Sequence, residues 1–325
     1  MPTPFATMIR SHRRFLSLVL AAVALIPCAA PSASPRKARI GVSLLTLTNP
    51  FFRDLGDAMK EEGAKCGFEV SVNSGEFDAA RQRNQVADFI VQKVGAIVLS
   101  PCDSKAIVTA IADANKAGIP VFTVDIAALG SGAKVVSHVA TDNLGGGRLA
   151  AQALIEALGG KGRVAILDHP EVESVILRTK GFDEELARQK AENGVTMQVV
   201  ARLPGGATKD KSFKAAEDLL QAHPDLNGIF AINDPSALGA VAALEKAGRL
   251  AQVKIVGFDG MPEGKQAIKN GQIYADPIQF PDRIGRTAVQ TIRKYLQGDD
   301  VEAQILIPTA LYRKADADKD SSLKK

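Results

Sequence analysis

Polar side chains that could bind a small molecule follow apolar runs of the chain at several places. Asp125 comes directly after the run 121–124, and Asn233 and Asp259 follow two later runs in the same way. Asn49 comes shortly after a first such run. Carboxylates accept hydrogen bonds and amides both donate and accept them, so these side chains suit a ligand with hydroxyl groups. The pattern indicates a site for a small polar molecule.

The elements that must position these side chains are strands and helices in strict alternation. Continuous apolar runs such as Ala96–Leu99 are typical of strands buried on both faces, and amphipathic segments such as Ala79–Val94 are typical of the helices between them. This alternation predicts an α/β fold with parallel strands, whose carboxyl ends share one edge where such sheets bind ligands. The predicted strands lie near residues 39–45, 69–73, 96–100, 121–125, 163–168, 196–201, 228–233 and 253–258.

The length of 325 residues indicates two domains, at about 150 residues per domain. Two halves share the same alternation and meet near residues 139–143, which predicts a crossover there. The segment 273–280 contains Pro277 and precedes a last predicted helix, 281–296, so we expect the chain to return to the first domain at that point. Lys, Asp and Ser dominate the end of the chain, which predicts a flexible tail over residues 314–325.

The N-terminal segment, residues 1–34, resembles an export signal. Arg10, Arg13 and Arg14 precede an uncharged apolar stretch, 15–26, which is followed by Pro and small residues. This stretch is shorter than the roughly 20 residues that a membrane-spanning helix needs, so a permanent anchor is the weaker interpretation. We expect an exported protein of the periplasm.

The three cysteines predict neither a lipid anchor nor a disulfide. Pro27 stands where a lipoprotein signal has a small residue, so lipidation of Cys28 is disfavoured. Cys66 ends the first predicted helix, whereas Cys102 follows a strand at the opposite end of the sheet. A helix of about 15 residues is about 22 Å long, far beyond the reach of a disulfide.

Several functional classes lack support in the sequence. The formal charge of +4 is small and the only basic run is the terminal lysines, which argues against nucleic acid as a partner. The four histidines are scattered without a CxxC pair, so no metal site is expected. The glycine runs 145–147 and 159–162 complete no phosphate-binding motif, and no GxSxG nucleophile motif occurs. We predict neither a cofactor nor catalysis.

Six segments stand out in order along the chain: Thr48–Phe52, Asp125 at its strand end, Ser137–Asn143, Phe230–Asp234, Val256–Gly260 and Gln279–Asp282. Taken together, they resemble the bacterial ribose-binding protein family, the type I periplasmic substrate-binding proteins of ABC importers. The similarity extends over residues 37–312, and its specificity comes from the combination of the segments.

The resemblance implies two Rossmann-like lobes with parallel sheets, joined by three hinge crossings, that close on a sugar. It also implies a monomer. The expected crossings lie near residues 140–141, 279–280 and 307–308. The expected lobes comprise residues 37–140 with 280–307, and residues 141–279 with 308–313.

By position, the resemblance places four pocket residues in the first lobe and four in the second lobe and hinge. They are Asn49, Phe51, Phe52 and Asp125, and then Asn233, Phe258, Asp259 and Gln279. Carboxylates and amides can pair with sugar hydroxyls, while the C–H faces of the ring pack on aromatic side chains. Local interpretations remain open beside these roles: the asparagines could cap helices, the paired phenylalanines could be core residues, and Asp259 before Gly260 could form an ordinary turn.

The sequence departs from the family pattern at three places. Ribose binders have an Arg directly after the first-lobe Asp, where this chain has Ile126. A second pocket Arg falls near Ile176, with only the following Arg178 retained, and an aromatic residue is replaced near Ala207. Because no aliphatic side chain replaces the rigid fork of donors of an arginine, the wall should be less polar.

These departures argue against ribose itself as the ligand. A neutral polyol or a different sugar, with a deoxy or methyl group against Ile126, is one hypothesis. An amino-bearing ligand is another, because Asp125 and Asp259 would otherwise lack positive partners. We expect His169 and its neighbours, in the loop after the strand 163–168, to shape the opening.

Three functions remain open. The favoured function is capture of a sugar or polyol and its delivery to an ABC permease. The alternative is a sensory protein that presents its closed form to a chemoreceptor or sensor kinase. A regulator of the lactose-repressor family is disfavoured, because an export signal stands where its DNA-binding helices would precede the lobes.

Overall fold

The computed structural model describes residues 38–324. The predicted export signal and Cys28 lie outside this part of the chain. Within it, no helix combines the length and the apolar character that crossing a membrane requires.

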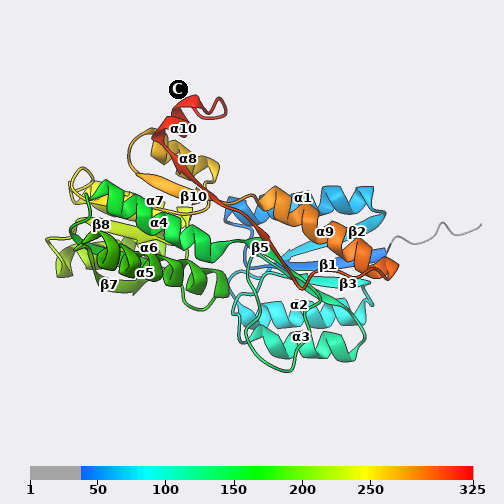
Figure 1. The fold of residues 1–325 in the computed structure, drawn as a ribbon. Helices are drawn as coiled ribbons and strands as arrows, with labels where there is room; N and C mark the ends of the chain where they lie inside the picture. The colour runs from blue at the N-terminus through cyan, green and yellow to red at the C-terminus, as the bar shows by residue number, and fades with distance from the viewer. Residues whose placement is uncertain (1–37, 325) are drawn as a thin grey trace, which may run out of the picture. The chain divides into compact units, whose positions relative to one another are not determined.

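The first sheet has the strand order β11-β5-β4-β3-β1-β2, and all of its neighbouring strands are parallel. Helices α1 and α9 pack together on one face, and α2 and α3 cover the other, as Figure 1 shows. We call this unit the first lobe. Its strands are β1 (Ala38–Leu44), β2 (Phe68–Ser74), β3 (Ala96–Leu99), β4 (Val121–Val124), β5 (His138–Thr141) and β11 (Gln304–Ile307). Its helices are α1 (Pro50–Lys65), α2 (Ala79–Val91), α3 (Ile107–Lys116) and α9 (Pro281–Gln297).

The second sheet has the order β12-β10-β9-β8-β6-β7 and, with its helices, forms the second lobe. Helices α4 and α5 pack together, as do α6 and α7. Its strands are β6 (Arg163–Asp168), β7 (Gln198–Pro204), β8 (Gly228–Ala231), β9 (Lys254–Val256), β10 (Ala275–Ile278) and β12 (Ala310–Arg313). Its helices are α4 (Asn143–Ala157), α5 (Glu173–Asn193), α6 (Lys209–Ala222), α7 (Asp234–Lys246), α8 (Pro262–Lys269) and α10 (Lys314–Lys319).

The predicted α/β fold with two Rossmann-like lobes is confirmed, with one correction to its strand directions. Strand β12 runs antiparallel to β10, so the second sheet is mixed at that edge. The reason is the short connection from β11, because a strand that enters the second sheet directly from the first has no helix to reverse its direction.

The chain passes between the two sheets three times: after β5, after β10 and after β11. Two of these passages are hydrogen-bonded to each other, since the Thr141 hydroxyl donates to Oε1 of Gln279 at 2.6 Å. The elements on either side of each passage belong to different lobes, so a change in the angle between the lobes must be taken up in these short segments.

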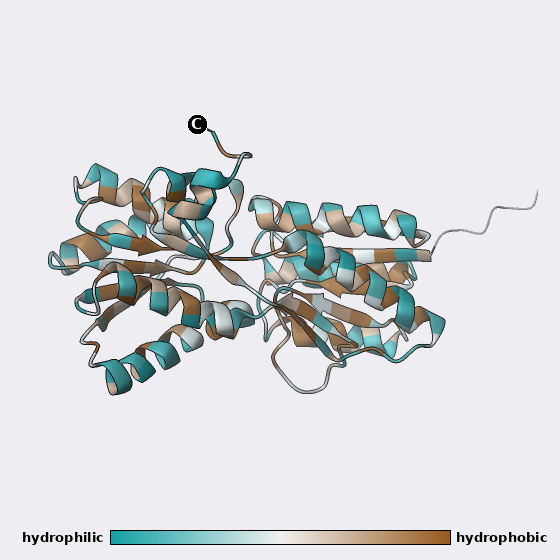
Figure 2. Ribbon diagram, turned by 45° about the horizontal axis from the view of Figure 1, so that its top comes forward, coloured by the Kyte–Doolittle hydropathy of each residue, from teal (hydrophilic) through white to brown (hydrophobic). Residues whose placement is uncertain are grey.

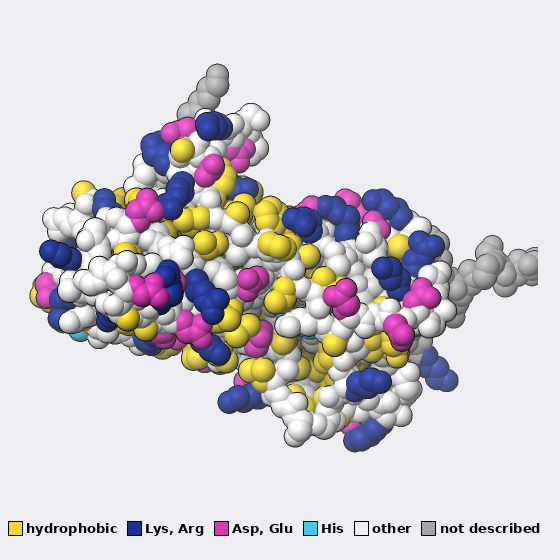
Figure 3. Space-filling view, viewed as in Figure 1, with side chains coloured by type: hydrophobic (Ala, Val, Ile, Leu, Met, Phe, Trp, Pro, Cys, Tyr) yellow, Lys and Arg dark blue, Asp and Glu magenta, His cyan; other side chains and the backbone are white. Residues whose placement is uncertain are grey.

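The core of each lobe lies where the sheet meets its helices. Figure 2 shows hydrophobic residues concentrated on the strands and hydrophilic residues on the outer faces of the helices. In the second lobe, the rings of Phe182 and Phe230 stack with their centroids 4.9 Å apart. On the face seen in Figure 3, basic and acidic side chains are interspersed rather than gathered by sign.

The glycine run 145–147 has a packing role in α4. Gly145 donates its amide hydrogen to the capping carboxylate of Asp142, so this helix start is already occupied by an anionic side chain. A side chain at Gly146 would collide with the ring of Phe258, and one at Gly147 would collide with the backbone of Arg178 in α5. These glycines allow close packing of helix against helix and helix against ring.

The sequence analysis missed four short strands, which are the outer two strands at one edge of each sheet. It predicted eight strands, and the four others are β5, β10, β11 and β12, of four residues each. The end of the chain also differs from the predicted flexible tail, because α10 buries Ala317 completely and Tyr312 donates a hydrogen bond to Asp320. Cys66 and Cys102 are free thiols.

Candidate ligand-binding site

The ends of the strands meet at a narrow cavity between the two lobes. All of the predicted site residues except Phe258 line it. The lining is Leu45, Asn49, Phe51, Phe52, Asp125, Ile126, His169, Val172, Ser174, Val175, Arg178, Ala207, Ile232, Asn233, Asp259 and Gln279. Side chains from both lobes and from the passage after β10 therefore line this cavity.

Three of the lining residues have an unusual backbone conformation. Asp125, Ala207 and Asp259 have φ angles of 61°, 56° and 100°, although none of them is a glycine. Each follows a strand, namely β4, β7 and β9. Such angles are sparsely populated by L-residues and tend to be found at functional sites, where the surrounding structure holds them in place.

Two lining asparagines also cap helices. The Asn49 Oδ1 accepts a hydrogen bond from the amide of Phe51 at 3.0 Å, at the start of α1 where Pro50 occupies the first position. The Asn233 Oδ1 accepts from the amide of Ser236 at 3.0 Å in α7. The local interpretation of both residues as caps is correct, and it is compatible with a place in the cavity wall.

The aromatic residues occupy two different positions. Phe51 and Phe52 meet edge to face with centroids 5.0 Å apart, and both are almost entirely buried while lining the cavity. Phe258 is 0 % exposed and does not line the cavity. Its ring lies beneath the guanidinium of Arg178, 3.9 Å from ring centroid to Cζ, which is a cation–π arrangement. The expectation that Phe258 faces the ligand is corrected accordingly.

Arg178 is the central cation of the site. Its Nε donates to Oδ1 of Asn143 at 2.8 Å, and its Nη1 donates to the carbonyl of Ile232 at 2.7 Å. Nη1 also lies 3.4 Å from Oδ1 of Asp259, a buried ion pair whose side chains are 4 % and 3 % exposed. The sequence analysis noted Arg178 without counting it among the site residues, because its distance from the strand ends along the chain hid this contact.

Asp259 is stabilised on several sides. Gln279 donates from Nε2 to Oδ1 of Asp259 at 2.7 Å, in addition to the contact with Arg178. Burial raises the pKa of Asp259, while Arg178 and the hydrogen bonds from Gln279 and Asn49 oppose that rise. Gln279 follows β10 in the passage between the lobes, so Asp259 is held by a residue of that passage as well as by Arg178.

Asp125 has a much poorer set of partners. It is 3 % exposed, and its Oδ1 has no hydrogen-bond partner among the described residues. Burial raises the pKa of Asp125 to about 7, and the charges of Asp259 and Glu173 act in the same direction while Arg178 opposes them. The two aspartates of the cavity thus differ, because one is hydrogen-bonded within the protein and the other faces the cavity with an open acceptor.

The positions that depart from the ribose-binder pattern divide into two groups. Ile126 and Ala207 both line the cavity, and both are buried. Ile176 does not line it, and Val172 and Val175 take that part of the wall. The expected loss of polarity is therefore present beside Asp125, whereas the position of Ile176 has no direct bearing on the cavity.

The loop between β6 and α5 brings His169 into the cavity wall. His169 Nδ1 lies 2.8 Å from a carboxylate oxygen of Glu171, and its Nε2 is buried without a partner in the described part of the chain. Burial lowers the pKa of His169, which favours the neutral ring. The same loop contacts the first lobe, because the amide of Glu173 donates to the hydroxyl of Ser104 at 2.9 Å.

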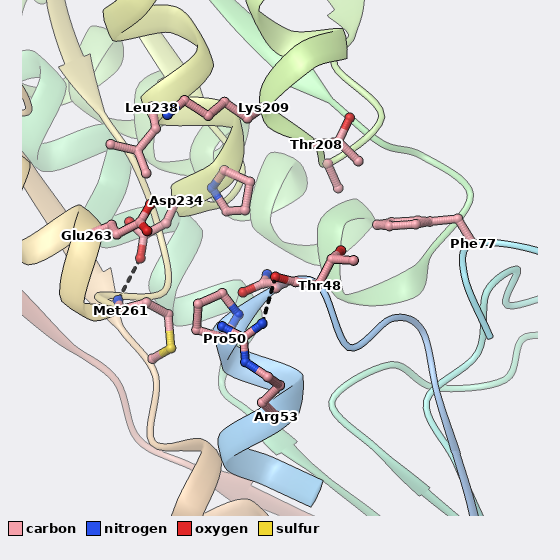
Figure 4. A pocket seen from close by; sticks show the side chains of 13 residues that line it. Thr48, Pro50, Arg53, Phe77, Thr208, Lys209, Asp234, Leu238, Met261 and Glu263 are labelled. Carbon is pink, nitrogen blue, oxygen red and sulfur yellow. Dashed lines mark hydrogen bonds between the residues drawn. The ribbon is translucent and has the colours of Figure 1, made fainter. Parts of the chain in front are cut away.

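A larger pocket of about 790 Å³ adjoins the cavity and shares Asn49 and Ala207 with it. Figure 4 shows the side chains that surround it. Those labelled from the first lobe are Thr48, Pro50, Arg53 and Phe77, and those from the second are Thr208, Lys209, Asp234, Leu238, Met261 and Glu263. Because it is the larger space and shares part of its wall with the cavity, it provides an opening toward the site.

A pair of buried carboxyl groups lies behind the site in the second lobe. Asp276 in β10 is 0 % exposed, and neither of its oxygens has a hydrogen-bond partner within residues 38–324, unless it shares a proton with Asp234. Burial raises the pKa of Asp276 to about 6, and it raises the pKa of Asp234 well above its ordinary value. The charge of Asp259 acts in the same direction on both. Burial therefore favours the neutral form of both carboxyls relative to an exposed aspartate.

We expect the variant Asp276→Asn to be more stable than the parent at pH 8 and to differ little from it at pH 4. Folding raises the pKa of Asp276, so its contribution to the free energy of unfolding is fully present at pH values below its unfolded pKa. That contribution is lost as the pH rises through about 6 and the buried carboxyl ionises. The gain at pH 8 should be about 3 kcal/mol, because the pKa rises from 3.8 to about 6 and one pKa unit corresponds to about 1.4 kcal/mol. Urea denaturation at both pH values measures it. An equal effect at the two pH values would contradict the raised pKa of Asp276, and the exposed Asp113→Asn serves as the control.

Comparisons with known proteins agree with this geometry. The model of the periplasmic binding protein domain family matches residues 40–300. The ribose import binding protein RbsB of Salmonella typhimurium is 36% identical over 290 residues, which cover 89% of this chain and 95% of that protein. The D-apiose import binding protein of Paraburkholderia graminis is 32% identical over 275 residues, which cover 83% of this chain and 86% of that protein.

A solved structure extends the similarity to the fold. An ABC transporter solute-binding protein from Agrobacterium vitis with bound D-fucose superposes with a TM-score of 0.80 at 29% identity, over 86% of this chain and 97% of that one. The binding proteins among these relatives are carriers of a ligand rather than enzymes. With its two α/β lobes, the cavity between them and these relatives, the chain belongs to the type I periplasmic binding proteins of ABC sugar importers.

Proposed function

We propose that this protein captures a sugar or polyol other than ribose in the cavity between its lobes and delivers it to an ABC permease from the periplasm. The observation that carries the proposal is the composition of the cavity wall. It combines two carboxylates, two asparagines and a glutamine with the phenylalanines of α1. Such a wall suits a molecule with many hydroxyls and an apolar ring face.

The proposed action of the site begins with ligand entering while the lobes are apart. The three passages between the sheets allow the lobes to approach, and residues of both lobes then surround the ligand. Asp125 with the phenylalanines binds from the first lobe, and Asp259 with Asn233 binds from the second. Exclusion of water strengthens each hydrogen bond, so the ligand stabilises the closed form that a permease can recognise.

Ile126 supports a ligand other than ribose. Its side chain is 1 % exposed and lines the cavity directly after Asp125. A branched aliphatic group beside the carboxylate offers an apolar contact and no hydrogen-bond donor. A hydroxyl placed there would lose its water without gaining a partner, so the ligand should present carbon at this point.

A thermal-shift screen of the purified protein tests the proposal. At a ligand concentration of about 100 times Kd, binding to the native state alone adds about 2.7 kcal/mol, which corresponds to a rise in Tm of roughly 5–10 °C. We expect such a rise with at least one compound among pentoses, hexoses, deoxysugars and polyols, and a smaller rise with D-ribose.

The variant Asp259→Ala should abolish the shift, because Arg178, Gln279 and the ligand all depend on that carboxylate. The exposed Asp113→Ala on α3 is the matched control and should keep the full shift. A folded protein that responds to no member of the panel would contradict the proposal.

A further inference from the structure

The hydrogen-bonding groups of the cavity are unequally satisfied. Three of its lining side chains donate to acceptors within the protein: Arg178 donates to Ile232 and Asn143, Gln279 donates to Asp259, and Asn233 donates from Nδ2 to the carbonyl of Ala207 at 3.2 Å. Among the fully buried side-chain nitrogen and oxygen atoms of the described lining residues, those without a partner are Oδ1 of Asp125 and Nε2 of His169.

Both of these open atoms are acceptors when Asp125 is ionised and His169 is neutral. A carboxylate oxygen only accepts, and Nε2 of a neutral histidine accepts when Nδ1 carries the proton and donates it to Glu171 at 2.8 Å. Burial favours the neutral ring of His169, in agreement with this assignment. A ligand that satisfies the cavity must therefore supply hydrogen-bond donors at two points.

The charge of the cavity wall also favours a ligand that supplies hydrogen-bond donors. Arg178 is its only Arg or Lys among the described lining residues, and it faces two buried carboxylates, Asp125 and Asp259. It lies in contact with Asp259, which also receives the hydrogen bond from Gln279. Asp125 has no such cation, and the adjacent residue Ile126 supplies none. A buried carboxylate without a cation is costly, and a positively charged ligand removes that cost.

We propose that the ligand is an amino-substituted sugar or polyol whose protonated amine binds the carboxylate of Asp125, with His169 accepting a second hydrogen bond from the same ligand. This inference rests on the proposed capture function and names the ligand class of that same site. An ammonium group carries three donors and one positive charge, so it meets both the open acceptors and the unbalanced charge. The apolar wall at Ile126 then packs against carbon next to the amine.

The experiment is calorimetric titration of the purified protein at pH 7 with matched sets of compounds. Each set contains an amine, its hydroxyl parent and its N-acetyl form: D-glucosamine, D-glucose and N-acetyl-D-glucosamine; the corresponding galactose and mannose sets; and 1-amino-1-deoxysorbitol with sorbitol and its N-acetyl form. The members of a set differ at one substituent, and acetylation removes the charge while it keeps the nitrogen. We expect one amine to bind at least tenfold more tightly than both of its neutral counterparts.

The variant Asp125→Asn tests the assigned partner, because it keeps the shape of the side chain and removes its charge. The ratio of amine affinity to parent affinity should fall to near one in this variant, whereas the surface variant Asp113→Asn should keep the ratio of the parent protein. A ratio unchanged by Asp125→Asn would overturn the assignment of the amine to Asp125.

The outcomes separate this inference from the function on which it rests. Tight binding of a neutral sugar or polyol, with no amine preferred tenfold, would overturn the inference and leave the capture function standing. Absence of binding by every member of this panel would overturn the inference, and absence of a thermal shift with the neutral screen as well would overturn the capture function. Preference for an amine that disappears in Asp125→Asn would support both.

Discussion

Replacing Arg178 by methionine is expected to abolish ligand binding and to lower the free energy of unfolding by about 4 kcal/mol. Methionine keeps a long apolar stem over Phe258 but removes the charge that lies 3.4 Å from Asp259. Asp259 and Asp125 would then share a buried cavity that has no Arg or Lys among its described lining residues. The carbonyl of Ile232 would also lose its hydrogen bond. Urea denaturation and calorimetric titration at pH 7 measure the two effects.

Two further variants show whether the ion pair is the cause. The double variant Arg178→Met with Asp259→Asn should regain part of the lost stability and none of the binding, because it removes the unpaired charge together with a binding group. Lys180→Met on the same helix is the matched control. Lys180 lies 3.8 Å from Glu184, and their side chains are 59 % and 40 % exposed, so its loss should cost less than about 1 kcal/mol. A cost below 1 kcal/mol for Arg178→Met would show that Asp259 does not depend on it.

Alanine at Gly147 or Gly181 is expected to destabilise the protein by about 3 kcal/mol and to weaken ligand binding. The two glycines face each other's helices: an added Cβ at Gly147 would overlap the carbonyl of Arg178, and one at Gly181 would overlap the carbonyl of Leu144. Backbone atoms cannot move aside as a flexible side chain can, so α4 and α5 must separate. That separation would also displace Arg178 from the cavity.

Gly56→Ala in α1 is the control for this pair of variants. Gly56 is also helical, but its added Cβ would lie 3.1 Å from a methyl group of Val72, which can give way slightly. Its effect should stay within about 1 kcal/mol, because the gain in helix propensity offsets the tighter contact. Thermal and urea denaturation of the three variants compare them directly. Equal stability of all three would mean that the contact between α4 and α5 is not tight.

The regular part of the fold follows from local patterns. Continuous apolar runs identified the central strands, because a strand buried on both faces has apolar residues at every position. Amphipathic stretches identified the helices, because a helix buried on one face has apolar residues only at a helical spacing. The edge strands Gln304–Ile307 and Ala310–Arg313 were missed because they are partly exposed, so they lack the continuous apolar run that marked buried strands of the same length. Helix α10 was missed for a related reason: a charged segment was read as a tail, and only its contact with the second lobe orders it.

The positions of the individual site residues needed the tertiary structure. Strand ends in parallel sheets converge, which is why Asp125, Asn233 and Asp259 could be placed at one edge from the sequence. Whether a side chain then faces the cavity depends on its backbone angles and on contacts between distant segments. Backbone angles and distant contacts of this sort set the φ angle of Asp125 and place Phe258 under Arg178. They also keep Ile176 out of the cavity wall.

The sequence by itself determined the α/β class, the two lobes and the resemblance to sugar-binding proteins, because these depend on periodicity and on motifs in order along the chain. Only the tertiary structure decided which of the two cavity aspartates has a cation. Arg178 lies 81 residues from Asp259 in the chain and yet contacts it, while Asp125 keeps an open acceptor. That difference arises from packing between elements distant in sequence, and no local pattern encodes it.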